Sequence, residues 1–193
     1  TLQGDTIFLR REAFERWLWL RAEVWESREG SASMRSALSL YGYDGDRRAA
    51  LARMAEAERE TLILHELGEH AAGRRLGPEW EDLMEGLADR RAEMAARAVR
   101  DLLADCLVTL PVLVQRNAVA SLHFWFANFT GMRRMLFPLL AQAREAWCAG
   151  SDDALAQAIG AGAPHWERVA RDLAALGAGV ARRVAEGEAG FIL

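Results

Sequence analysis

The sequence predicts an all-α fold, namely a single-domain antiparallel helical bundle of about five long helices plus one or two short ones. Apolar residues recur at the three- and four-residue spacing of amphipathic helices, whereas the alternating pattern of strands is nearly absent. With 193 residues, 51% of them hydrophobic, the chain is long enough to bury one large core. We therefore expect one helical domain over residues 1–193 with a loose tail at 187–193.

Glycine, proline and capping residues mark the ends of the expected helices. Asp46 is a good N-cap for a long helix that runs to Arg75. Pro78 suits the first turn of the next helix, which we expect to continue to Leu110, where Pro111 breaks or kinks it. The expected helices cover about 11–29, 34–40, 47–75, 78–110, 117–147 with irregularity at Gly131 and Pro138, a short stretch after 151, and 164–186.

The charge balance argues against a general nucleic-acid binder. The formal net charge is -4, and the arginine doublets are interleaved with acids along the chain rather than gathered in one segment. A nucleic-acid surface needs a basic face that neutralises phosphates. We therefore expect no nucleic-acid partner.

The apolar segments predict a cytoplasmic protein that does not enter a membrane. The longest of them, residues 102–114, contains an aspartate and is too short to cross a bilayer. The first residues, TLQGDTIFLRRE, carry charge too early for a secretory signal. Seven tryptophans and an additional apolar face on the helix over 117–147 favour a homodimer or a protein partner.

The segment HELGEH at residues 65–70 contains half of the four histidines in the chain. A rotation of about 100° per residue places Glu58, His65 and Glu69 on the apolar face of the helix over 47–75. Glu66 and His70 lie more than a quarter turn away, on the flank, and form their own i, i+4 pair. We therefore expect a polar cluster that points into the core.

The spacing of the motif excludes several familiar metal sites. A zincin needs two histidines four residues apart, but His65 and His70 are separated by about 140° around the helix. The inverse zincin pattern fails by one residue, and a ferritin-type di-iron site needs Glu-x-x-His on two helices. The fragment from His65 to Glu69 is similar to one helix of the hemerythrin pattern, which requires more histidines than this chain has.

The first functional hypothesis is a binding or interaction module with a buried polar network of Glu, His and Arg. Arg91 on the following helix is expected level with the His65 region, where it would pair with the glutamates, and Glu66 and His70 extend the network. Asp101 and Asp105 share the inward stripe of that helix but are expected nearer the start of the helix over 47–75.

The second hypothesis is a non-haem iron, manganese or zinc protein, with oxidoreductase activity as one option. Its candidate ligands are His65, Glu69, His123 and Glu58. Glu58 precedes His65 by two turns, about 10 Å along the axis, and would serve a second ion or support the first ligands. Haem between helices is a third option, although no attachment motif is present. No nucleophile elbow, P-loop or dinucleotide motif occurs, so catalytic residues are not assigned.

Overall fold

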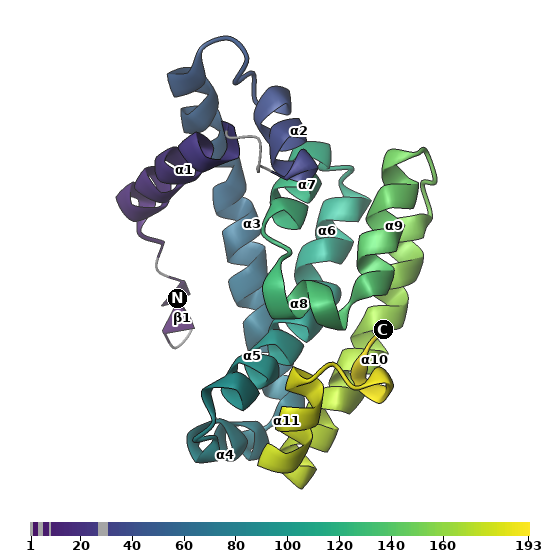
Figure 1. The fold of residues 1–193 in the computed structure, drawn as a ribbon. Coiled ribbons are helices and arrows are strands. Elements are labelled where there is room, and N and C mark those ends of the chain that lie inside the picture. Colours follow the sequence, from purple (N-terminus) through teal and green to yellow (C-terminus); the bar gives the residue numbers. More distant parts are fainter. Residues whose placement is uncertain (1, 4–5, 8, 27–30) are drawn as a thin grey trace. The chain divides into compact units, whose positions relative to one another are not determined.

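Helices dominate the computed structural model, which describes residues 2–3, 6–7, 9–26 and 31–193 (Figure 1). Within these ranges the strands are short and pair antiparallel, with Leu2 opposite Ile7. The predicted all-α class is confirmed. The described elements are β1 (Leu2–Gln3), β2 (Thr6–Ile7), α1 (Arg11–Glu26), α2 (Ala32–Leu40), α3 (Arg47–Leu76), α4 (Pro78–Gly86), α5 (Arg90–Ala104), the π-helix η1 (Asp105–Thr109), α6 (Leu110–Gln115), α7 (Val119–Ala127), α8 (Gly131–Leu136), α9 (Pro138–Cys148), α10 (Ala154–Leu176), α11 (Ala178–Ala185) and the 3₁₀-helix η2 (Ala189–Phe191).

The chain forms two compact units. The first comprises Thr1–Glu66 and Val112–Phe129, and the second comprises Leu67–Pro111 and Thr130–Leu193. The single domain and the antiparallel bundle expected from the sequence stay predictions. The expected end of the first helix near residue 29 lies outside the described residues. No helix in the described ranges combines the length and the apolar character that crossing a bilayer requires.

The first unit has an apolar core to which α1, α2, α3 and α7 contribute. The side chain of Ser31 caps α2 by accepting the N–H of Met34, which fixes where the helix begins. The rings of Phe14 and Trp17 each lie edge-on to Phe124 of α7, with centroids 6.4 Å apart. The core residues are Leu18, Ala22, Met34, Ala37, Leu38, Tyr43, Ala50, Leu51, Met54, Ala55 and Phe124.

The second unit is organised around α10, which packs against α4, α5, α9 and α11 (Figure 1). Trp166 of α10 is fully buried, and its ring meets Phe137 at a centroid distance of 5.4 Å. The helix continues through Pro164, where the sequence predicts the start of a new helix. Gly162 allows a close approach there, because a Cβ at this position would lie 2.7 Å from the Sγ of Cys106.

The expected helix over 78–110 is divided in the structure. Helix α4 ends at Gly86, and Asp89 starts α5 as an N-cap whose side chain accepts the N–H groups of Arg91 and Ala92. This interruption changes the rotational register of the following helix relative to one unbroken helix. As a result Arg91 is exposed, although the sequence placed it level with the His65 region, where it would pair with the glutamates.

A π-helical turn connects α5 to α6 and lets the helix continue through Pro111. The N–H of Leu110 donates to the carbonyl of Asp105, five residues earlier. Proline has no N–H, and its ring crowds the carbonyl of the preceding turn, so a wider turn accommodates it. At Pro111, where the sequence predicts a break or a kink, the helix therefore widens locally and continues. The helix expected over 117–147 forms α7, α8 and α9, and α8 and α9 begin at Gly131 and Pro138, the two positions where irregularity is expected.

Helices α3 and α5 approach each other closely in the second unit at Gly68, the glycine of HELGEH. Gly68 is buried, and a Cβ built on it would lie 2.5 Å from the backbone oxygen of Ala104. No side chain fits at this distance without a backbone shift. Gly68 therefore permits a helix contact that any other residue would push apart.

The C-terminal segment is held to the second unit by its backbone. The N–H of Leu193 donates to the carbonyl of Leu136, and the N–H of Leu139 donates back to Leu193, each at 3.0 Å. Phe191 is buried, and its carbonyl lies 3.3 Å from the Nε2 atom of His165. Residues 187–193, for which the sequence predicts a loose tail, thus carry specific contacts.

Substitution Gly68→Ala should lower the free energy of unfolding by about 2 kcal/mol or more, because a backbone oxygen has little freedom to move aside. Gly73→Ala is the matched control on the same helix, since among the described residues no atom beyond its own stretch of helix lies within 4 Å of a Cβ built there. That change should be neutral or should stabilise by about 0.5–1 kcal/mol. Urea unfolding of both variants checks this, and equal effects would contradict the close approach at Gly68.

Candidate functional site

Next to Gly68, the carboxylate of Glu69 meets two side chains of α5. The Nη2 atom of Arg100 donates to Oε1 of Glu69 at 2.8 Å and lies 3.5 Å from Oδ1 of Asp101. All three side chains are partly buried, with exposed fractions of 27% for Arg100 and Asp101 and 29% for Glu69. The second unit therefore contains two carboxylates that are contacted by one guanidinium nitrogen, and all three side chains are partly accessible to solvent.

His65 lies one turn before Glu69 on the uninterrupted helix α3, so both side chains project from the same face of that helix. One ring nitrogen of His65 and one carboxylate oxygen of Asp101 each lie within 4.8 Å of a carboxylate oxygen of Glu69. Two ligand atoms about 2.1 Å from one ion can be at most about 4.2 Å apart. The distances from Glu69 to these two groups are therefore at most slightly longer than those between ligands of one ion.

The donor set of His65, Glu69 and Asp101 is one nitrogen and two oxygens. Imidazole and carboxylate suit zinc, manganese and iron, whereas the site offers no thiolate that would favour soft ions. Because three protein ligands do not fill a tetrahedral or octahedral shell, a bound ion would keep at least one position for water or another small ligand. The chemistry of the residues thus fits a non-haem metal.

Two of the four predicted metal ligands, His65 and Glu69, fall in this cluster. In the described part of the chain, the cluster of potential ligands contains neither Glu58 nor His123. Asp101, which the sequence placed on the inward stripe near another part of the helix over 47–75, joins it instead. His123 lies on α7 and is partly buried.

Arg100, and not Arg91, is the arginine that contacts Glu69. Arg91 lies in the first turn of α5, where its Nη2 donates to the carbonyl of Ala185 on α11 at 3.2 Å. The interruption before Asp89 explains the difference, because it changes both the register of the helix and the length of chain between the two helices. Glu66 is partly buried and His70 is exposed, as their place on the flank of the helix leads one to expect.

Glu58 belongs to a separate polar network in the first unit. It is fully buried, and its two oxygens accept hydrogen bonds from Tyr41 Oη at 2.6 Å and Thr61 Oγ1 at 2.7 Å. Burial raises the pKa of Glu58 above its usual range, against the opposite effect of hydrogen bonds from Thr61, Tyr41 and Ser121. Burial, with the nearby Glu58 carboxyl, also raises the pKa of Tyr41. These hydroxyls satisfy the carboxyl without a compensating positive charge.

A further buried acid, Asp105, begins the π-helical turn after α5. Its side chain has no exposed surface, and Arg133 of α8 donates to its Oδ2 at 3.2 Å. The Arg133 side chain is 23% exposed, so the ion pair extends from the buried Asp105 carboxylate towards the solvent. Asp105 is therefore paired with a different arginine from the one that contacts Asp101, one turn earlier.

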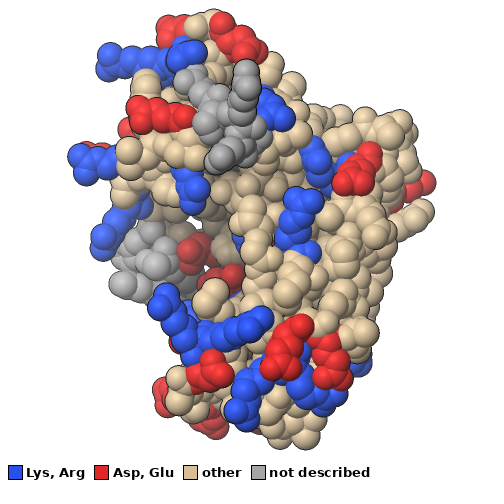
Figure 2. Space-filling view, viewed as in Figure 1, with Lys and Arg blue, Asp and Glu red and all other residues tan. Residues whose placement is uncertain are grey.

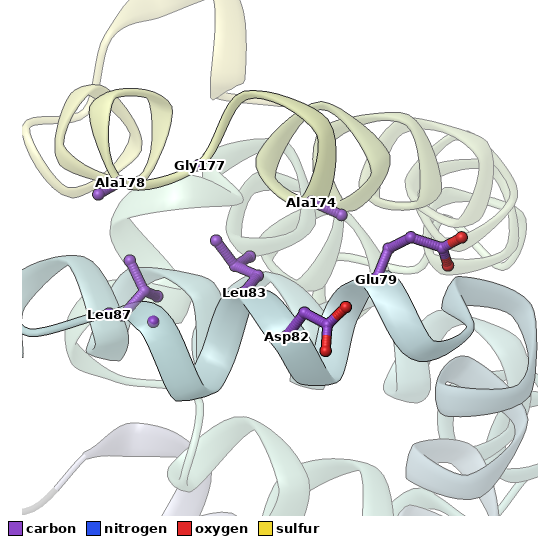
Figure 3. Close-up of a pocket in the computed structure, with 8 residues that line it drawn as sticks. Glu79, Asp82, Leu83, Leu87, Ala174, Gly177 and Ala178 are labelled. Carbon is purple, nitrogen blue, oxygen red and sulfur yellow. The ribbon is translucent and has the colours of Figure 1, made fainter.

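A shallow hollow of about 390 Å³ separates α4 from the α10–α11 junction (Figure 3). Its walls are Leu83, Leu87 and small residues around Gly177, with Glu79 and Asp82 on the α4 side. None of these residues belongs to the cluster around Glu69.

On the face drawn in Figure 2, arginine and acidic side chains are interspersed rather than separated by sign. Ion pairs of the second unit follow the same pattern, since Glu167 accepts from Arg75 at 3.0 Å and from Arg171 at 2.6 Å. Such exposed pairs contribute little to stability. These ion pairs are typical of solvated helix surfaces rather than of a binding patch.

The fold and the cluster define an all-α protein with a partly buried His–carboxylate–Arg group. Residues 15–187 match the sequence profile of the C-terminal domain of a family of unknown function (DUF6866), and the chain belongs to this family. Comparison with curated proteins and with solved structures found no match.

Replacement of Glu58 by Gln should change how stability depends on pH. The folded-state pKa of Glu58 is raised above the unfolded value of about 4.3. Between these values the folded protein binds the proton more readily than the unfolded chain, so rising pH removes stability from the wild type. The free energy of unfolding of the wild type, minus that of Glu58→Gln, should therefore fall as pH rises above about 4.3 and then level off. Urea unfolding between about pH 4 and 8 measures this difference, and a constant or rising value would contradict a buried Glu58.

Proposed function

We propose that this protein is a non-haem metal-binding helical protein in which His65, Glu69 and Asp101 supply the ligands. Two observations support the proposal: carboxylate oxygens of Glu69 and Asp101 lie within 4.8 Å of each other in the second unit, and His65 precedes Glu69 by one turn on α3. Zinc, manganese and iron(II) are the ions that suit this donor set. Their shared requirement is a neutral imidazole and ionised carboxylates.

Partial exposure of the cluster supports a role beyond structure. Structural zinc sites are usually closed by four protein ligands, whereas catalytic sites leave a position open. Here Glu69 and Asp101 are 29% and 27% exposed, so water or a small substrate has access to an ion held between them. Metal activation of water or oxygen is the chemistry that such a position supplies.

The alternative is a binding module in which the same residues form a salt-bridge network. The ion pairs of Arg100 with Glu69 and Asp101 support it, because they already compensate both carboxylates. The two functions differ in metal content: the module would remain empty and the metal protein would not.

Purified protein should contain, or take up from Mn²⁺, Fe²⁺ or Zn²⁺ solution, about one equivalent of metal, since the ligands are already grouped. His65→Ala and Glu69→Gln should each abolish this binding. His70→Ala is the matched control: it lies on the same helix outside the cluster and should retain the metal. Elemental analysis by plasma mass spectrometry measures the content. A wild type that stays empty after exposure to all three ions would refute the metal function and leave the salt-bridge module.

A further inference from the structure

Arg100 contacts both of the carboxylates that the proposed metal ion would bind. A single nitrogen, Nη2, lies 2.8 Å from Glu69 and 3.5 Å from Asp101. A cation that contacts both acids lowers their mutual repulsion, as a bound metal would. The two cations would therefore compete for the same pair of carboxylates.

We propose that Arg100 is a built-in competitor that neutralises the site when metal is absent and swings out when metal binds. This inference rests on the proposed function and adds its regulation. The affinity of the site is then set by the exchange of a guanidinium for a divalent ion rather than by the ligands alone. Such a site stays closed to metal at low concentration and fills only when the ion outcompetes the arginine.

The way in which Arg100 is bound makes it releasable. A guanidinium binds a carboxylate most strongly through two parallel N–H donors, but Arg100 contacts Glu69 through one nitrogen only. Its Nε atom is buried and has no hydrogen-bond partner within the described residues. A buried donor without an acceptor is unfavourable. Release of the Arg100 side chain from the carboxylates would therefore remove the free-energy cost of its buried Nε donor.

The side chain of Arg100 also has access to solvent. It is 27% exposed, and the guanidinium that leaves the carboxylates can therefore be hydrated rather than buried without a partner. Asp105, the next acid along the helix, is paired with Arg133 at 3.2 Å and does not depend on Arg100. Release of Arg100 thus leaves the neighbouring ion pair in place.

Arg97 provides the matched control. It lies three residues earlier on α5 and pairs with Glu93 through Nε at 3.0 Å and Nη2 at 2.7 Å. Glu93 is outside the cluster of potential ligands. Arg97→Gln removes the same charge from the same helix as Arg100→Gln. Comparison of the two variants therefore distinguishes competition for the carboxylates from a general change in charge.

The test is calorimetric titration of the wild type, Arg100→Gln and Arg97→Gln with Mn²⁺. Hydrogen bonds to charged groups are strong enough that loss of the competitor should tighten binding by about tenfold. Arg97→Gln should bind within about twofold of the wild type, because exposed pairs matter little. Weaker or unchanged binding by Arg100→Gln, with a wild type that binds, would overturn the competition and make Arg100 a positioning residue. If neither the wild type nor Arg100→Gln binds Mn²⁺, Fe²⁺ or Zn²⁺, the proposed metal function fails.

Thermal unfolding gives a second readout of the same exchange. Without metal, Arg100→Gln removes the cation that contacts both carboxylates and should unfold at a lower temperature than the wild type. Saturating Mn²⁺ should then raise its midpoint by more than it raises that of the wild type. If Arg100→Gln does not fold, Arg100→Met serves instead, because it keeps an apolar stem of similar length and removes the competing charge. It should bind Mn²⁺ more tightly than the wild type, and equal or weaker binding would overturn the proposal.

Discussion

The close contact between α3 and α5 at Gly68 is the constraint on which the cluster depends. A backbone oxygen at 2.5 Å from the position of a missing Cβ fixes the separation of the two helices at Ala104. Glu69 follows Gly68 directly, and Asp101 precedes Ala104 by three residues, so both carboxylates lie within one turn of the contact. The small residue sets the distance between the helices, and that distance brings the charged residues together.

The sequence predicted the helix that carries the cluster but not all of its partners. The apolar periodicity of residues 47–75 is long and uninterrupted, and the structure has a helix over Arg47–Leu76. Glu58 was expected to point inward and is fully buried. These features depend on local pattern alone, which a single sequence contains.

The partner arginine was assigned incorrectly because it depends on a helix end. Periodicity over 78–110 shows no clear interruption, so Arg91 was placed level with the glutamates of the preceding helix. Asp89 could have indicated the interruption, because it has the chemistry of an N-cap and stands before Arg90. Gly68 was a second signal: a glycine within a strong helix pattern weakens the helix unless close packing compensates. Which backbone atom it meets is a tertiary fact that spacing cannot supply.

The three acid sites differ in how the protein neutralises them, and the difference indicates which can exchange its partner. Glu58 is buried among hydroxyl donors, so its neutral form is favoured and a cation has no access to it. Asp105 is buried completely and pairs with Arg133, and removing one partner of a buried ion pair is strongly destabilising. Glu69 is 29% exposed and faces an arginine bound through one nitrogen, so one cation can replace another while solvent stabilises the cation that leaves. Only a site of this third kind combines an affinity for cations with a path for their exchange, and HELGEH contributes to it through Gly68 and Glu69 together.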